Sequence, residues 1–522
     1  MGKPSFVRSA GVVSACTLLS RVLGFVRDML CSHYIGAGMT WDAFVVAFRI
    51  PNLFRRLFGE GALTAAFLPA FVERCDGGRP EEARSLLGKL VGALGLLLGA
   101  LVAAGIALTF LLPGDPKNAL LAELLRIMLP YLALICVAAI LGAALNGLRH
   151  YFTPAIAPVI LNVTWIAALL LRAGDVRAVA WAVLVGGVLE LLILVPPLLS
   201  RRMIGLPKLD LRDPGMREVG GQFLPIVFGL ALVQINEAVG SVIAREGVPG
   251  VGAVSAIYYG NQIVQLPLAL IGTALATAVY PLFSSPKEVF EDVFSKSLRL
   301  VLLLSLPATA GLLVLARPIV SLLFEHGQFG AAAADRTSWV VLLYAAGLWC
   351  YCANQIQARA FYARKDARTP VKVSATMVLL NLGLSLALVG PIGERGIALA
   401  NSVTGLATFL ALNVLLRRRV PTVDLRPVYG SFARSVLVAA ITGAAAWGAY
   451  HLLGGVEGAT IGPKLVRALV PVAAGIAAFL LAARLLQKDE LRLLLRRSHD
   501  DRGLPETHPP DLPRPGPEAR SG

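Results

Sequence analysis

The sequence predicts an all-α integral membrane protein, and two observations carry that prediction. First, 56% of the 522 residues are hydrophobic and only 15% are charged, whereas soluble domains are about 45–50% apolar and about 25% charged. Second, the apolar runs are long enough for helices and lack the alternating segments of roughly ten residues that outer-membrane barrels use. Most of the chain is therefore expected to lie in lipid.

A hydrocarbon core of about 30 Å requires about 20 apolar residues per helix, and by that measure the chain holds about 14 transmembrane helices. The first two spans contain several charges, which lower their hydropathy. The expected spans are residues 10–34, 41–72, 86–112, 121–148, 154–172, 178–199, 219–244, 252–283, 294–316, 335–362, 370–390, 394–416, 430–453 and 464–486.

The basic residues of the short loops predict the orientation of the chain, because cytoplasmic loops are enriched in Lys and Arg. With the N-terminus inside, the inside loops carry the richer clusters, such as Arg417, Arg418 and Arg419. The outside loops carry one or two basic residues each, such as Lys117. The pattern predicts a multi-pass protein of the cytoplasmic (inner) membrane with both termini in the cytoplasm.

An internal repeat predicts two similar halves. Residues Gly59–Phe71 align with Ile271–Phe283, and Thr153-Pro154 aligns with Thr369-Pro370. Parallel repeats of six spans give two lobes related by a pseudo-twofold axis along the membrane normal, with the substrate site between them. Chance similarity between apolar stretches is the alternative. The predicted units are an N-lobe at 1–217, a C-lobe at 218–418, two additional helices at 419–487 and a disordered cytoplasmic tail at 488–522.

The stretch from Ser20 to Phe71 holds charges inside apolar sequence. A charge at the bilayer centre costs about 2.5–3.5 kcal/mol on insertion scales, unless it faces a wet cavity, a partner charge or a ligand. Arginines outnumber carboxylates there, which indicates an anionic ligand. The eight charged residues are Arg21, Arg27, Asp28, Asp42, Arg49, Arg55, Arg56 and Glu60.

Helical spacing pairs some of these charges but not all of them. Residues seven or four apart share a helix face, which matches Arg21–Asp28, Asp42–Arg49 and Arg56–Glu60. Arg27 and Arg55 have no mate at that spacing, and the neighbours Arg27 and Asp28 are expected to point in different directions. A purely structural net of charges is one interpretation. A ligand cavity is favoured, because buried membrane charges are functional by default.

The residue types indicate what such a cavity binds. A guanidinium presents several donors in a plane and stays charged, which suits a diphosphate. Polar side chains in the second half suit sugars or amides, although helix–helix hydrogen bonds worth about 0.6 kcal/mol each are the alternative. The polar set comprises Gln222, Gln234, Asn236, Glu237, Asn261, Gln262, Gln265, Asn354, Gln355, Gln357 and Arg359.

Other functions find little support in the sequence. No Walker A, HExxH, CxxC or GxSxG motif is present, so we expect no enzyme, no bound cofactor and no metal site. The six cysteines lack metal-ligand spacing. The net charge of +16 falls mostly in loops that orient the chain, and no basic face with interleaved aromatics indicates nucleic acid.

Three motifs closely resemble the MurJ (MviN) family of the multidrug, oligosaccharidyl-lipid and polysaccharide exporter superfamily. They are SRVLGFVRD at Ser20–Asp28, the block Gly36–Pro69, and Tyr258–Pro281. The resemblance implies a flippase for lipid II, the undecaprenyl-diphosphate-linked peptidoglycan precursor. It also implies that two extra helices, about Tyr429–Leu486, border a groove for the lipid tail.

The resemblance implies a set of substrate-binding residues. Family members often place an arginine where this chain has Gln262, and some place an acid at Gln265, so Arg359 is a candidate substitute. The set is Arg21, Arg27, Asp28, Asp42, Arg55, Arg56, Glu60, Gln262, Gln265 and Arg359.

Ion coupling is left open by the sequence. Some relatives are thought to bind sodium through carboxylates where this chain has Gly240 and Ser385, although Asn381 remains and Glu237 lies nearby. Coupling to the membrane potential or to a monovalent cation is thus an alternative to an uncoupled cycle.

The leading hypothesis is translocation of lipid II by alternating access, with arginines holding the diphosphate while Asp28 and Asp42 position them. The expected partners are lipid II, the membrane and cell-wall synthesis proteins. One alternative is export of another lipid-linked oligosaccharide or of drugs by the same superfamily. A scaffold that recruits cell-wall enzymes is a further alternative, but it gives the intramembrane charges no purpose.

Overall fold

The structure, a computed structural model, describes residues 6–59, 62–205, 207–210, 212–284, 287–422, 424–454 and 460–495. Over those ranges every regular element is a helix, which confirms the predicted all-α class. In chain order the first elements are α1 (Phe6–Tyr34), α2 (Met39–Phe54), the π-helix η1 (Arg55–Gly59), α3 (Ala62–Asp76), α4 (Pro80–Thr109), α5 (Pro116–Gly147), α6 (Phe152–Leu171), α7 (Val176–Ser200) and α8 (Pro214–Gly247).

The second half of the chain repeats this pattern of long helices. Its elements are α9 (Ala253–Pro267), the π-helix η2 (Leu268–Thr273), α10 (Ala274–Val279), the 3-10 helix η3 (Pro281–Ser284), α11 (Lys287–Leu323), α12 (Ala331–Ala346), α13 (Leu348–Ala363), α14 (Arg368–Ile392), α15 (Glu394–Arg419), α16 (Arg426–Leu452), α17 (Ile461–Leu486) and α18 (Lys488–Leu495).

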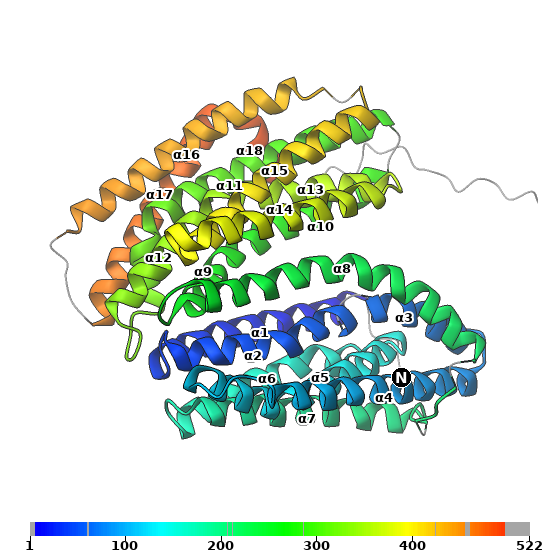
Figure 1. Ribbon diagram of the computed structural model, residues 1–522. Coiled ribbons are helices and arrows are strands. Elements are labelled where there is room, and N and C mark those ends of the chain that lie inside the picture. The colour runs from blue at the N-terminus through cyan, green and yellow to red at the C-terminus, as the bar shows by residue number, and fades with distance from the viewer. Residues whose placement is uncertain are drawn as a thin grey trace, which may run out of the picture.

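The helices form two bundles, which we call the first lobe (α1–α7) and the second lobe (α8–α15) (Figure 1). In the first lobe α5 packs against α2, α4 and α7. In the second lobe α11 packs against α12 and α13, and it also packs against α16 and α17. Helix α8 packs against α3 of the first lobe and against α14 of the second, so it joins the two lobes.

Ten of the helices are long and apolar enough to cross a membrane, and the α12–α13 pair, bent by 41°, is an eleventh if it counts as one span. Among the described helices that fail this test, α1, α2 and α8 contain charged side chains. Each predicted span falls on a helix or on a run of consecutive helices, but the total of 14 spans stays a prediction.

Backbone geometry supports the internal repeat. The π-helices η1 and η2 lie where the aligned motifs Gly59–Phe71 and Ile271–Phe283 begin, and π-helical turns are rare in proteins. Arg149 and Lys365 both adopt left-handed backbone angles, with φ of 59° and 60°. They stand at the same offset from each other as the two Thr-Pro pairs. Shared local geometry at two places favours a genuine repeat over chance similarity of apolar sequence.

The predicted tail beginning at residue 488 needs a correction, because Lys488–Leu495 form the helix α18. The Glu490 side chain on this helix is only 1% exposed and accepts hydrogen bonds from Arg299 at 2.6 Å and from Ser431 at 3.0 Å. A composition-based prediction missed this pairing because the partners lie on α11 and α16. The rest of the predicted tail, 496–522, lies outside the described residues, and the other unit boundaries stay predictions.

Candidate functional site

The two lobes are joined at the end of the bundle where α1 ends, which we call the Tyr34 end. The backbone N–H of Gln328, in the α11–α12 loop, donates to the carbonyl of His33 at 2.9 Å. Gly36 has a φ of +81°, and a Cβ there would lie 2.6 Å from the Gln328 carbonyl oxygen. Glycine therefore permits both the turn after α1 and the close approach of the second lobe.

Arg27 and Asp28 lie within the interface between the lobes. The Arg27 Nη2 atom lies 2.8 Å from Asp28 Oδ1, and the exposed fractions of the two side chains are 13% and 4%. The prediction that these neighbours point in different directions is therefore wrong. Residue spacing fixes where Cβ atoms point, whereas the long arginine side chain folds back so that its guanidinium reaches the adjacent carboxylate.

Both lobes contribute partners to this pair. From the second lobe, Tyr258 Oη donates to Asp28 at 3.0 Å and Gln262 Nε2 donates at 2.9 Å. From α6, Asn162 Oδ1 accepts from Arg27 at 3.1 Å, and the guanidinium lies 4.3 Å from the centroid of a Trp165 ring. Asp28 is thus a buried acceptor shared by the two lobes.

Asp42 has a different partner from the predicted one. Its carboxylate accepts from the backbone N–H groups of Gly252 at 2.6 Å and Ser255 at 2.8 Å, and from the Ser255 hydroxyl at 2.5 Å. It therefore caps the N-terminus of α9, whose own N-cap residue is a glycine with φ +91°. The predicted Asp42–Arg49 pair is wrong, because the nearer donors come from 210 residues along the chain.

Two further arginines reach α8 across the interface. Arg49 Nη1 donates to the backbone carbonyl of Glu237 at 2.5 Å. Arg56 Nη1 lies 3.0 Å from the Glu237 carboxylate, and both side chains are more than a third exposed. The predicted partner of Arg56, Glu60, lies outside the described residues. Arg55 Nε donates to Asn52 at 3.0 Å.

The second lobe contains a cavity of about 390 Å³ beside this interface. The predicted polar set contributes Asn236, Glu237, Asn261, Gln265 and Asn354 to its lining, and Arg49 closes it from the first lobe. Gln357 does not line it and instead donates to the Phe409 carbonyl, which is the helix–helix role. Five of the eleven residues of the set thus face one space, where their side chains suit a sugar or peptide.

The predicted residues do not all meet. Arg27, Asp28 and Gln262 form one network, while Gln265 lines the neighbouring cavity. Arg359 instead donates to Thr277 at 3.4 Å and lies 5.3 Å from the ring centroid of Tyr280. Arg21 is exposed on α1.

Sequence reasoning missed Asn162, Trp165 and Tyr258. Asn162 had a usable signal, because it is the only amide in the apolar run Phe152–Leu171. The two aromatic residues had none, since aromatic residues in such helices mostly pack in the core. Across the part of the chain that is described, no group of three or more His, Cys, Asp or Glu residues is placed to hold a metal ion.

An apolar groove of about 390 Å³ runs beside the interface. The residues that line it come from α1, α9, η2, α11, α16 and α17 and include Phe25, Leu266, Leu312, Gly475 and Phe479. A groove of this kind suits a hydrocarbon chain. It lies next to the helix that carries Arg27.

Comparison with known proteins gives one consistent result. The family model described as lipid II flippase MurJ matches residues 31–459. A probable lipid II flippase MurJ of Vibrio cholerae serotype O1 is 33% identical over 437 residues, which are 79% of this chain and 82% of that protein. The lipid II flippase MurJ of Burkholderia cenocepacia is 33% identical over 434 residues, 79% and 84% of the two chains.

Solved structures share the fold. A lipid II flippase MurJ in an inward closed conformation superposes with a TM-score of 0.77 at 24% identity, covering 92% of this chain and 99% of that one. A multidrug resistance transporter of the MATE family, in an inward-facing conformation, gives a TM-score of 0.63 at 16% identity, covering 80% and 100%.

Proposed function

The chain belongs to the MurJ family, and from that premise we propose that it moves lipid II across the cytoplasmic membrane by alternating access. The observation that carries the proposal is the Asp28 network. One buried carboxylate holds Arg27 and also receives Tyr258 and Gln262 from the other lobe. A ligand that takes Arg27 from Asp28 therefore leaves the carboxylate that joins the lobes without its counter-charge.

A diphosphate is the ligand chemistry that fits this exchange. It offers a guanidinium several acceptor oxygens, as the carboxylate does, and carries more negative charge. We propose that Arg27, with Arg55 and Arg21, receives the diphosphate while the lobes are parted at the end opposite Tyr34. Asp28 then accepts from Tyr258 and Gln262 alone, and the closed contact depends on a buried carboxylate without its counter-charge, which is costly.

The rest of lipid II has places to lie. The amide-lined cavity of the second lobe suits the sugar and peptide part, since its lining offers both donors and acceptors. The apolar groove bordered by α16 and α17 suits the polyprenyl tail. The lobes then rock about the substrate, the head group crosses, and the tail stays in lipid. No bond is made or broken, so the protein acts as a transporter.

The loop charges support an orientation with both termini in the cytoplasm, which places the Tyr34 end at the outer face of the membrane. Charges that move with the lobes couple the cycle to the membrane potential, at about 2.3 kcal/mol per charge per 100 mV. Cell-wall synthesis enzymes that consume lipid II at the outer face are the proposed partners. Another undecaprenyl-diphosphate glycan shares the chemistry and is the alternative substrate.

The test uses bacteria depleted of their own lipid II flippase. The unmodified chain is expected to restore growth, whereas Arg27→Ala and Arg55→Ala fail at equal amounts of protein in the membrane. Arg395→Gln is the matched control. The guanidinium carbon of Arg395 lies 5.0 Å from the ring centroid of Trp339, and Arg395 lines neither cavity.

The other outcomes separate the alternatives. Full rescue by both substitutions would contradict the proposal. Altered drug tolerance without rescue would favour an exporter, since a drug pump does not need these cations. A scaffold would tolerate both substitutions but not removal of residues 496–522.

A further inference from the structure

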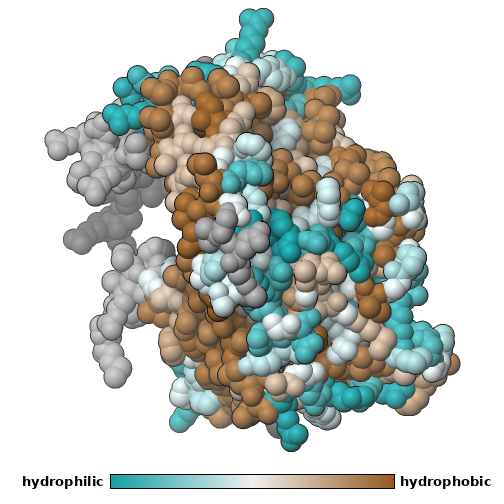
Figure 2. Space-filling model, turned by 90° about the vertical axis from the view of Figure 1, so that its left-hand side faces the viewer, coloured by the Kyte–Doolittle hydropathy of each residue, from teal (hydrophilic) through white to brown (hydrophobic). Residues whose placement is uncertain are grey.

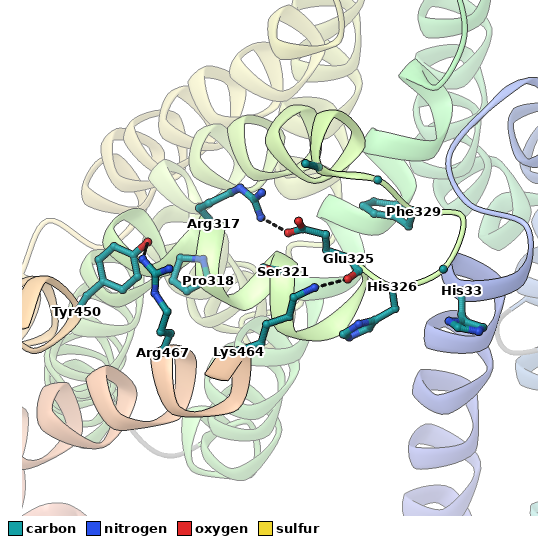
Figure 3. Close-up of a pocket in the computed structure, with 13 residues that line it drawn as sticks. His33, Arg317, Pro318, Ser321, Glu325, His326, Phe329, Tyr450, Lys464 and Arg467 are labelled. Carbon is teal, nitrogen blue, oxygen red and sulfur yellow. Dashed lines mark hydrogen bonds and ion pairs between the residues drawn. The ribbon is translucent and has the colours of Figure 1, made fainter. Parts of the chain in front are cut away.

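A second basic site lies at the Tyr34 end, away from Arg27. It is a cavity of about 740 Å³ between α1, the α11–α12 loop, α16 and α17, and we call it the end pocket. Figure 3 shows its side chains coming from different helices, with Arg467 beside Tyr450 and Lys464 beside the α11–α12 loop. The residues that matter below are Arg317, Glu325, Tyr450, Lys464 and Arg467.

The cations of the end pocket are not all neutralised. Arg317 pairs with Glu325 at 2.5 Å and with Asp335 at 2.6 Å. By contrast, Lys464 donates to the backbone carbonyl of Glu325, and Arg467 donates to the Tyr450 hydroxyl at 3.1 Å. Among the residues that are described, no carboxylate forms an ion pair with Lys464 or Arg467. Lys464 and Arg467 thus face the cavity while their hydrogen bonds go to neutral acceptors.

Glu325 offsets the positive charge of the end pocket only in part. Burial, the largest single effect, raises the pKa of Glu325, but the hydrogen bonds from Arg317 and Ser321 and the positive charges of Arg317 and Lys464 together outweigh it, and the pKa lies below its ordinary value. The carboxylate therefore stays ionised, but the three cations Arg317, Lys464 and Arg467 outnumber the two carboxylates Glu325 and Asp335. An anion that enters the end pocket meets a net positive surface.

The end pocket and the apolar groove lie along the same two helices. On α17, Lys464 and Arg467 line the pocket, while Pro471, Gly475 and Phe479 line the groove. These five residues recur at intervals of three and four, so they form one helix face.

The neighbouring helix α16 behaves in the same way. Tyr450 lines the pocket, whereas Ala446 and Thr442, four and eight residues earlier, line the groove. At 1.5 Å rise per residue, Arg467 stands about 12 Å along α17 from Gly475. Along both helices the basic end pocket is therefore followed by the apolar groove.

The surface at this end has the matching polarity. Figure 2, which looks onto the Tyr34 end, shows hydrophilic side chains across its middle and at parts of the edge, with hydrophobic ones on either side of the middle. A molecule with an oily chain and an anionic head would lie with its chain among the helices and its head in this hydrophilic region.

We propose that the end pocket and the apolar groove together bind a polyprenyl lipid by its phosphate end, with the phosphate on Lys464 and Arg467. The inference rests on the proposed function for the identity of the lipid and for the assignment of the Tyr34 end to the outer face. It adds a second binding site, at which the flipped lipid is held by its diphosphate before release.

The experiment measures lipid binding to the full-length chain in detergent by native mass spectrometry, with Arg27→Ala present to remove the central site. The probes are undecaprenyl diphosphate, undecaprenol and inorganic pyrophosphate. Undecaprenyl diphosphate is expected to bind at least about tenfold more tightly than undecaprenol, because charge-assisted hydrogen bonds to the phosphate are gained. Lys464→Gln and Arg467→Gln are each expected to weaken it about tenfold.

Controls make each outcome decisive. Arg395→Gln removes one charge at the same end outside the pocket and is expected to leave binding within about twofold, while Lys464→Arg keeps the charge and retains binding. Unchanged affinity in the Lys464→Gln/Arg467→Gln chain would overturn the proposal, as would equal binding of undecaprenol. Pyrophosphate that binds as tightly as the lipid would identify a site for free anions instead.

This binding result is independent of the transport test. Loss of growth in the Arg27→Ala chain with intact lipid binding supports both the central and the terminal sites. Intact binding at the end pocket, together with full growth of bacteria that carry the Arg27→Ala chain, would contradict the proposed function. It would still support the lipid site in the end pocket.

Discussion

Two basic side chains at the interface between the lobes and two in the end pocket have opposite kinds of partner. At the interface Arg27 lies on Asp28, nearly buried, and Arg56 lies on Glu237. In the end pocket Lys464 and Arg467 rest on a backbone carbonyl and a tyrosine hydroxyl. A buried cation that already has a carboxylate acts as a contact that a ligand must displace. One held by neutral acceptors in an open cavity is ready for an anion.

The largest expected effect comes from removing the shared acceptor at the interface. Asp28→Ala leaves the Arg27 guanidinium without its carboxylate, and breaking a buried pair from one side costs about 3–5 kcal/mol. The melting temperature of the purified protein is expected to fall sharply. Asp28→Asn keeps one acceptor oxygen and is expected to lose less. An Asp28→Ala protein that melts like the unmodified chain would show that the pair contributes nothing to the joined lobes.

Asp42 tests whether a cap supplied across the interface matters as much as a local one. Asp42→Ala leaves the N–H groups of Gly252 and Ser255 without their acceptor, at an expected cost of about 2 kcal/mol. Amide hydrogen exchange should accelerate at the start of α9. Asp213→Ala is the matched control, because Asp213 is the residue just before α8 and caps that helix itself. Its faster exchange should be confined to α8, and equal protection of α9 in both variants would refute the role of Asp42.

Gly36 tests the close approach of the lobes at the Tyr34 end. Gly36→Ala places a Cβ at a φ of +81° and against the Gln328 carbonyl. A left-handed alanine costs roughly 1–2 kcal/mol, which shifts the closed population about tenfold. A cysteine at Gln328 should then react faster with a membrane-impermeant maleimide. Gly38→Ala, whose Cβ meets nothing within 4 Å, is the control, and equal labelling rates in the two variants would contradict the account.

The smallest effect is expected at Glu237. The Arg56–Glu237 pair is more than a third exposed on both sides, and such pairs contribute about 0.2–1 kcal/mol. Glu237→Gln should lower the melting temperature only slightly and should remove part of its dependence on salt. Glu218→Gln, which breaks the pair with Arg74 elsewhere on α8, is the comparison. A loss at Glu237 as large as that at Asp28 would erase the distinction between exposed and buried pairs.

The fold was largely predictable because hydrophobic length is local information. Each predicted span needed only its own run of apolar residues, and the repeat needed two short motifs. The tail was mispredicted at Lys488–Leu495 for the opposite reason, since Glu490 is held by residues of α11 and α16. Order that depends on distant partners leaves little trace in local composition.

The charged residues Arg27 and Asp28 at the interface could be singled out from the sequence, whereas their partners could not. Intramembrane charge was sufficient to single out Arg27 and Asp28, because its cost requires a reason. Helix periodicity then gave the wrong pairs, because it describes the directions of Cβ atoms and not how far a guanidinium group can reach. The role of Asp42 depends on a glycine of the second lobe that cannot cap its own helix. Sequence spacing contains no such information.

The most direct test of the central claim joins the lobes and follows lipid II. His33→Cys and Gln328→Cys place exposed side chains on either side of the contact at the Tyr34 end, and a short bismaleimide links them. Lipid II that reaches the outer leaflet is measured by cleavage with an enzyme added from outside. The account predicts delivery by the unlinked protein and by each single variant treated with the reagent, and none by the linked protein. Continued delivery of lipid II with the lobes linked would contradict it.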